Sequence, residues 1–225
     1  IPHMICGGFS KEETESALID LKFLGIDNVL ALRGDSMKSE SSFIPAEGGH
    51  KYALELIEQI NDMNIGQYLY EETKNSPSNF CIGAAGYPEK HFESMNLSSD
   101  LKNLKKKVDA GAEFIVTQLF YDNQKYFEFV EKCRSIGIKI PIIPGLKPIT
   151  TQKHLTFIPK FFHVNFPEEL SNELEKCKTN HEIKAVGEEW SVKQCKELIK
   201  SKVPALHFYT MGRGVAIKNI ARKIF

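Results

Sequence analysis

A short apolar run that stops abruptly in charged residues limits the folds open to this chain more than any other feature. The run 29–32 (VLAL) lacks the alternation of a half-exposed strand, as is typical of a parallel strand covered on both faces. Arg33, Gly34 and Asp35 follow directly. Parallel sheets wound with helices bind ligands at this end of the strand. A glycine turn with a solvated Arg–Asp pair is the alternative explanation.

Short apolar segments alternate with helical patterns six times along the chain. Strands are predicted at 1–6, 28–32, 80–86, 113–119, 140–145 and 205–210, the first of them ending near His3. Helices are predicted from Ser10 to 24, at 50–63, 100–110, 123–136, 191–201 and 214–225, with one or two more in 150–180. The first helix carries a capping box, Ser10 with Glu13, and Gly25 suits its C-terminus. This alternation predicts an α/β fold with a parallel sheet.

The number of strand–helix units favours an incomplete (β/α)8 TIM barrel. Such barrels typically need eight units and about 250 residues, whereas this chain offers about six units in 225 residues. We therefore expect one catalytic barrel domain over 1–225, without a regulatory domain. Its first two units would precede this sequence. A doubly wound open sheet is the alternative, although no G-x-G-x-x-G follows any predicted strand.

Charge and cysteine content exclude several classes of partner. Lys plus Arg equals Asp plus Glu at 29 each, which argues against nucleic acid or an anionic membrane as the main partner. No apolar run approaches the roughly 20 residues of a membrane span. The five cysteines are widely spaced and form no C-x-x-C pair, so the sequence predicts neither a disulfide framework nor a zinc site. This cysteine usage fits the reducing cytoplasm.

Side chains capable of chemistry end five of the six predicted strands. They are His3, Arg33, Asp35, Tyr87, Glu89, His91, Thr117, Gln118, His207, Tyr209, Thr210 and Arg213. Buried polar groups must be paired or in use, so their convergence at one sheet edge favours a ligand site. Each has a structural alternative when taken singly. His3 could be a core histidine, His91 a surface residue, and Tyr87 and Tyr209 packing residues with a wet hydroxyl.

The predicted helix 100–110 offers a second polar set. Asp100, Asn103, Lys106 and Lys107 occupy one arc beside its apolar stripe. The two lysines could neutralise a phosphate, while Asp100 and Asn103 could bond a sugar hydroxyl. A solvated basic helix face is the commoner explanation for such a pattern. The sequence shows no Walker motif, no Ser–His–Asp signature and no metal-binding cluster.

Taken together, six segments resemble one known family. They are Pro2–His3, LALRGD at 30–35, AGYPEKH at 85–91, the stretch 100–122, IIPGLKPI at 142–149 and HFYTMGR at 207–213. In order and spacing they are similar to methylenetetrahydrofolate reductases, which are flavin-dependent barrel enzymes of folate one-carbon metabolism and methionine biosynthesis. LRGD alone would be weak, but the whole set is highly specific.

The resemblance implies an FAD site and a two-substrate reaction. The positions implied to contact the flavin are His3, Arg33, Gly34, Asp35, Ala53, Tyr87, His91, Asp100, Asn103, Lys106 and Lys107. Asp35 and Gln118 would be the catalytic residues and would meet the folate, with Arg213 on its glutamate tail. NADH or NADPH would reduce FAD and leave, and 5,10-methylenetetrahydrofolate would then take the hydride to become 5-methyltetrahydrofolate. We also expect a homo-oligomer.

The chain departs from the family pattern in two ways. The family's general acid, a glutamate on the first barrel strand, has no counterpart in this sequence. The aromatic residue that the family often places after the seventh strand has only Phe157 nearby. These departures leave open a non-catalytic FAD-binding subunit. A flavin-free folate-binding methyltransferase barrel is the third hypothesis, and the polar arc at 100–107 argues against it.

Overall fold

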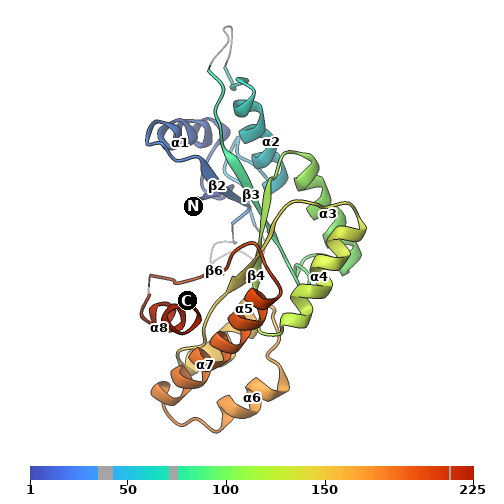
Figure 1. Ribbon diagram of the computed structural model, residues 1–225. Coiled ribbons are helices and arrows are strands. Elements are labelled where there is room, and N and C mark those ends of the chain that lie inside the picture. Colours follow the sequence, from blue (N-terminus) through green and yellow to red (C-terminus); the bar gives the residue numbers. More distant parts are fainter. Residues whose placement is uncertain (35–42, 71–75, 213) are drawn as a thin grey trace. The chain divides into compact units, whose positions relative to one another are not determined.

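The computed structural model describes residues 1–34, 43–70, 76–212 and 214–225. Strands and helices alternate along the chain (Figure 1). Their bounds are β1 His3–Ile5, α1 Lys11–Phe23, β2 Asn28–Leu32, α2 Ala53–Asn64, β3 Cys81–Gly86, α3 Leu97–Asp109, β4 Phe114–Leu119, α4 Asn123–Ser135, β5 Ile142–Leu146, α5 Gln152–Phe162, α6 Glu168–Glu175, α7 Asn180–Lys200, β6 His207–Phe208 and α8 Val215–Ile224. No helix in these ranges is both long and apolar enough to cross a bilayer.

The strands form a sheet in chain order, β1-β2-β3-β4-β5-β6. The β1–β2, β2–β3 and β5–β6 pairs are parallel, with His3 opposite Leu30 and Gly145 opposite His207. This order lacks the reversal that defines a doubly wound sheet. The predicted parallel α/β class is therefore confirmed, and the strand order is that of part of a (β/α)8 barrel. The two preceding units stay a prediction.

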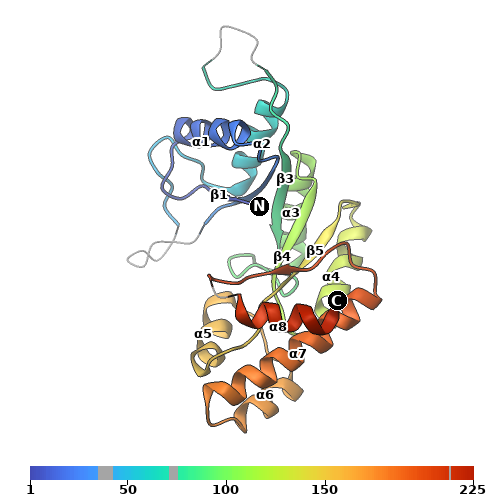
Figure 2. The same cartoon turned by 60° about the vertical axis from the view of Figure 1, so that its left-hand side comes forward.

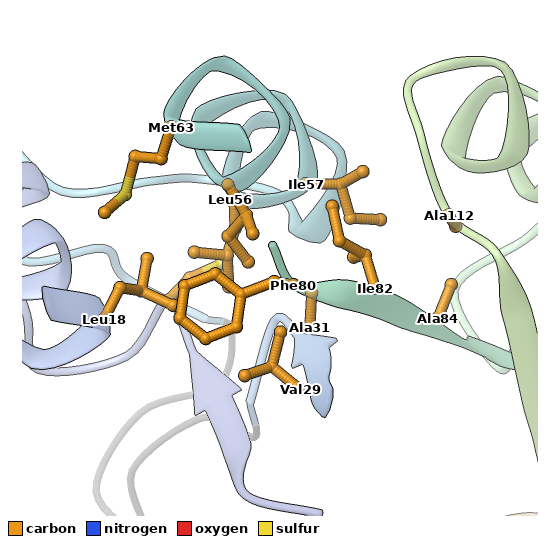
Figure 3. Close-up of a cluster of buried hydrophobic side chains, with 12 residues drawn as sticks. Leu18, Val29, Ala31, Leu56, Ile57, Met63, Phe80, Ile82, Ala84 and Ala112 are labelled. Atoms are coloured by element: carbon orange, nitrogen blue, oxygen red, sulfur yellow. The ribbon is translucent and has the colours of Figure 1, made fainter. Parts of the chain in front are cut away.

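The chain divides into two compact units. We call residues 1–85 with 102–115 the N-terminal unit, and residues 86–101 with 116–225 the C-terminal unit. The core of the N-terminal unit joins α1, β2, α2 and β3 (Figure 3). Its fully buried side chains include Leu18, Val29, Ala31, Leu56, Ile57, Met63 and Ile82. Burial of this aliphatic surface fixes β2, whose polar continuation is the first part of the candidate site.

The predicted ends of α1 are correct, whereas the predicted start of α2 is not. At α1, Glu13 N donates to Ser10 Oγ and Ser10 N donates to Glu13 Oε2, and Gly25 ends the helix with φ +72°. The capping box and the glycine are both confirmed. Helix α2 begins at Ala53 rather than at residue 50, because the Glu55 carboxylate accepts the N–H groups of Lys51 and Tyr52.

The core of the C-terminal unit packs α5, α6 and α7 against the end of β4. Leu119 lies in one buried cluster with Ile158, Leu170 and Ile183, and Trp190 Nε1 of α7 donates to Tyr121 O at 3.0 Å. Helix α6 packs on α7, and so does α8, as both views show (Figures 1 and 2). Helices α5, α6 and α7 cover the face of β4 that carries Leu119.

Three further predicted boundaries, beyond the start of α2, are wrong. Helix α7 begins at Asn180 rather than at 191, because Thr179 and Glu182 form a capping box that lies among polar residues. Helix α3 begins at Leu97 rather than at residue 100. Strand β1 starts at His3 instead of ending there, because pairing continues past Ile5 to the hydrogen bond from Cys6 N to Leu32 O.

Candidate functional site

The N-terminal unit contributes the turn after β2. Gly34 has φ +87°, a left-handed conformation that a residue with a Cβ adopts only with strain. The Arg33 guanidinium carbon lies 5.3 Å from the centre of the Phe43 ring, a cation–π distance that holds the side chain beside the turn. Asp35, the predicted catalytic carboxylate, lies outside the described residues.

One lysine side chain of α3 reaches the end of β3. Lys107 Nζ donates to Ala85 O at 2.9 Å, which places its ammonium at the C-terminal end of the strand. Lys106 and Asn103 are exposed on the same helix. Ala53 is the first residue of α2, and the Glu55 carboxylate of the same helix already lies at this N-terminus. The two lysine ammonium groups are of the kind that binds a diphosphate.

His3 is placed at the start of β1 and not at its end. It lies level with Leu30, three residues before Arg33. Partial burial lowers the pKa of its imidazole, so the ring is neutral at pH 7. A neutral histidine can donate from one ring nitrogen and accept at the other.

In the C-terminal unit Asp100 organises the loop that follows β3. Its Oδ2 accepts from His91 N at 3.0 Å and its Oδ1 accepts from Ser94 Oγ at 2.9 Å. Lys90 Nζ closes the same loop through Ser94 O at 2.6 Å. The sequence predicted that Asp100 would bind a sugar hydroxyl. The structure also gives it a positioning role, and its carboxylate keeps lone pairs to spare.

Aromatic rings line this loop. The Tyr87 and His91 rings meet edge to face with centroids 4.6 Å apart, and Phe92 stacks between His91 and His163. His91 Nδ1 accepts from Glu93 N at 3.2 Å, so the proton of the neutral imidazole is on Nε2. The loop thus presents flat aromatic surface suited to a ring system.

Gln118 lies at the end of β4 with its carboxamide oriented. Its Oε1 accepts from Leu119 N at 2.9 Å, which leaves the amide nitrogen to donate outward. Leu119 packs toward α5, α6 and α7, so alternation along the strand turns Gln118 to the opposite face. Gln118 therefore presents an N–H donor at the strand end.

A rigid support lies between β4, β5 and β6. Gly145 N donates to Thr117 Oγ1 at 2.9 Å, and Tyr209 Oη donates to Thr117 O at 2.8 Å. A Cβ on Gly145 would collide with Thr117 O. Burial raises the pKa of Tyr209 far above its usual value, so the hydroxyl stays protonated and keeps donating. These contacts fix the backbone of Thr117, which precedes Gln118.

Two residues considered in the sequence, Arg213 and Phe157, are not part of the site geometry described above. Arg213, predicted to bind the glutamate tail, lies outside the described residues. Phe157 lies on α5, where it is 46% exposed and stacks on Phe161 with ring centroids 5.0 Å apart. Among the residues that the structure describes, no group of His, Cys, Asp and Glu is arranged to hold a metal ion.

Sequence analysis missed Lys147. It predicted that β5 ends in Pro144–Gly145, but the strand runs to Leu146 and the lysine follows. Lys147 is half-buried, and its Nζ lies 3.5 Å from Tyr209 O. A charged residue directly after an apolar strand was the available signal, and the neighbouring Pro-Gly turn obscured it.

A parallel sheet in chain order, with helices between its strands, places the chain in the class of (β/α)8 barrel folds. Residues 1–224 match the family Methylenetetrahydrofolate reductase. The chain belongs to this family. The family-level resemblance read from its motifs is thereby confirmed.

Individual relatives agree with this assignment. The chain is 40% identical over 220 residues to methylenetetrahydrofolate reductase (NADH) 1 of Arabidopsis thaliana, with 93% of this chain and 35% of that protein covered. It is 36% identical to methylenetetrahydrofolate reductase 1 of Schizosaccharomyces pombe, with 99% of this chain and 35% of that protein covered. It is 31% identical to 5,10-methylenetetrahydrofolate reductase of Pectobacterium carotovorum, with 94% of this chain and 65% of that protein covered. The chain thus spans about a third of the length of the plant and yeast proteins.

One solved structure has a similar fold. It is a Clostridium thermocellum protein that binds two copies of 5-methyl-5,6,7,8-tetrahydrofolic acid, matched with a TM-score of 0.58 and 16% identity over 99% of this chain and 70% of that one. At this identity the likeness establishes the fold alone.

Proposed function

We propose that the protein reduces 5,10-methylenetetrahydrofolate to 5-methyltetrahydrofolate with NADH or NADPH, as a cytoplasmic homo-oligomer. The match to the reductase family over residues 1–224 carries this proposal. The order would be ping-pong, with the nicotinamide dinucleotide leaving before the folate binds. FAD, when bound, would supply the chemistry that stores a hydride between the two substrates.

The residues of the N-terminal unit fit the charged part of FAD. Lys107 is already directed to the end of β3 by its bond to Ala85 O, and Lys106 is free to approach a phosphate from the same helix. Arg33 and Gly34 would lie against the flavin, since a glycine with φ +87° allows close backbone approach. Ala53 adds the N-terminus of α2. His3 and Asn103 complete the proposed set in this unit.

The residues of the C-terminal unit fit a ring system and a sugar. Tyr87 and His91 present an edge-to-face pair, and the proton on His91 Nε2 can donate to a carbonyl or phosphate oxygen. Asp100 keeps the loop in place through two hydrogen bonds and retains acceptor capacity for a hydroxyl. Preorganised donors of this kind reduce the entropy that binding would otherwise lose.

Gln118 and Asp35 would act on the substrates. The oriented amide of Gln118 can donate to a carbonyl or ring nitrogen of whichever heterocycle lies above it, first nicotinamide and then folate. Asp35 would stabilise the cation that forms when the folate's methylene bridge opens to an iminium. Arg213 would bind the carboxylate of the folate's glutamate tail.

Anaerobic spectroscopy of the full-length natural protein tests the proposal. A flavin spectrum that bleaches with NADH or NADPH and recovers with methylenetetrahydrofolate would support it. A colourless protein would favour the flavin-free methyltransferase barrel. A flavin that neither substrate oxidises or reduces would favour the non-catalytic subunit.

Variants at the two catalytic positions refine the test. Asp35→Asn should slow reoxidation by the folate about 100-fold and reduction by nicotinamide much less, because the cation forms only in the folate half-reaction. Gln118→Glu replaces the amide donor by a charge and should slow both half-reactions. Equal slowing of both halves in Asp35→Asn, measured by stopped flow, would contradict the electrostatic role.

A further inference from the structure

Lys147 is a half-buried cation at the end of β5 that the proposed chemistry does not use. Its Nζ has one hydrogen bond in the described structure, a long one of 3.5 Å to Tyr209 O. Lys147 forms no ion pair with a carboxylate of the described ranges. Burial lowers the pKa of its ammonium, as expected of a charge that has lost water without gaining a counterion among the described residues.

The backbone around Lys147 is held from two sides. Buried Tyr121 donates its hydroxyl to Lys147 O at 3.0 Å, and Tyr209 N donates to Leu146 O at 2.9 Å. The position of the lysine is therefore set by the core and by β6. A cation on such a fixed support is preorganised for a ligand, unlike a lysine on a solvated helix.

Lys147 lies one residue beyond the C-terminal end of β5, and this is the end of the sheet at which Gln118 lies in β4. The contact between Gly145 N and Thr117 Oγ1 places the ends of β4 and β5 level with each other.

We propose that Lys147 binds an oxyanion of a substrate of the proposed reduction. The inference rests on the proposed function, which brings two anionic substrates to this strand edge. The oxyanion is either a carboxylate of the folate's glutamate tail or a phosphate of the nicotinamide dinucleotide. Either would give the ammonium a charge-assisted hydrogen bond in place of the long contact to Tyr209 O.

Half-reaction kinetics distinguish the two sources. In the full-length natural protein Lys147→Met removes the charge and keeps the length of the side chain. If the folate carboxylate is the partner, the Kd or KM for folate should rise about 10- to 100-fold while nicotinamide binding is unchanged. If a dinucleotide phosphate is the partner, the pattern reverses. Lys147→Arg should restore most of the affinity in either case.

Binding without turnover provides the second readout. Calorimetric titration with 5-methyltetrahydrofolate, and separately with NAD+ or NADP+, should show the same selective loss in Lys147→Met. Lys153→Met, which removes an exposed lysine of α5, is the matched control and should change neither affinity. Lys147→Gln serves the same purpose if the Met variant fails to fold.

The outcomes separate the two proposals. A wild-type protein that performs neither half-reaction would overturn the proposed function and this inference with it. A wild-type protein that turns over, with both affinities unchanged in Lys147→Met, would overturn the role of Lys147 alone. Equal loss of both affinities, not restored by Lys147→Arg, would indicate a structural role and would also overturn it.

Discussion

The two compact units use their polar residues differently. In the N-terminal unit the site residues are cations and small residues, such as Arg33, Gly34 and Lys107, that follow elements fixed by an aliphatic core. In the C-terminal unit the polar groups of the site are hydrogen-bonded to one another or to neighbouring backbone. Asp100 holds its loop, and Thr117 is bonded by both Gly145 and Tyr209.

This difference indicates a division of work. Cations suit the capture of a phosphate, since a point charge tolerates variation in geometry. Oriented amides and rings suit the placement of a heterocycle, where small displacements are costly. We therefore expect changes in the N-terminal unit to alter mainly cofactor affinity, and changes in the C-terminal unit to alter stability and reaction geometry together.

The largest expected effect comes from two matched glycines. In Gly145→Ala the new Cβ would meet the backbone oxygen of Thr117 and lie 2.7 Å from the Tyr209 ring, so we expect a loss of roughly 3 kcal/mol or more. In Gly83→Ala it would meet the Phe114 ring, a side chain that can turn, and the loss should be roughly 1–3 kcal/mol. Urea denaturation measures both. Equal losses would mean that the C-terminal support is no more rigid than the N-terminal core.

A smaller effect is expected for Lys107→Ala. Removal of the ammonium that bonds Ala85 O should weaken FAD retention by about 1–3 kcal/mol, the value of one charge-assisted hydrogen bond. Equilibrium dialysis of FAD against the apoprotein measures it. Lys105→Ala is the control, because that lysine pairs with Asp109 on the same helix. Identical FAD affinity in the two variants would contradict the assignment of Lys107.

Tyr209→Phe should have a still smaller effect on stability. It keeps the ring but removes the hydroxyl that donates to Thr117 O, and one buried hydrogen bond contributes about 1 kcal/mol. Thermal denaturation should show the loss, whereas Tyr52→Phe, at a tyrosine 50% exposed in the N-terminal unit, should be neutral. Unchanged thermal stability in Tyr209→Phe would show that the Tyr209 hydroxyl does not stabilise the contact between β4 and β6.

Mild alkali should give the smallest effect. Burial raises the pKa of Cys6, Cys133 and Cys195 to about 12, so these thiols stay protonated in the native state and ionise on unfolding. The unfolded state then binds fewer protons, and stability falls as pH rises from about 9 toward 12. From an ordinary thiol pKa of 9.0, each thiol should lower the free energy of unfolding by about 0.4 kcal/mol at pH 9.

The alkali effect also differs between the units. The C-terminal unit holds two of these thiols and the N-terminal unit holds one. Amide hydrogen exchange between pH 7 and 9, corrected for the intrinsic rate, should therefore lose more protection in the C-terminal unit. Cys133→Ala should reduce that loss. A greater loss in the N-terminal unit would contradict the comparison.

Local chemistry made much of the fold predictable. The box of Ser10 and Glu13 involves residues three apart, and Gly25 needs only its own backbone angle, so both could be read from the sequence. The start of α7 could not, because its buried face includes Gly187, Ser191 and Gln194 and therefore shows no continuous apolar stripe in the sequence. The true extent of β1 depends on Leu32, which is distant in sequence.

The candidate site was predictable in identity but not in role. Motifs pointed to Asp100 and Gln118, yet the hydrogen bonds that orient them run to His91, Ser94 and Leu119 and carry no sequence signature. Lys147 was missed because its significance depends on Tyr209, which lies 62 residues away along the chain. Tertiary contacts of this kind decide which polar residue is a ligand and which is a support.

The hydrogen bond from Trp190 to Tyr121 O gives the molecule a built-in optical reporter. Trp190 is the only tryptophan in this sequence, and its indole packs against the core cluster of the C-terminal unit. Its emission should shift to longer wavelength when that cluster opens to water. Tryptophan fluorescence therefore follows the C-terminal unit alone, and far-ultraviolet circular dichroism follows both units. Divergence of the two signals during unfolding would reveal whether the units melt separately.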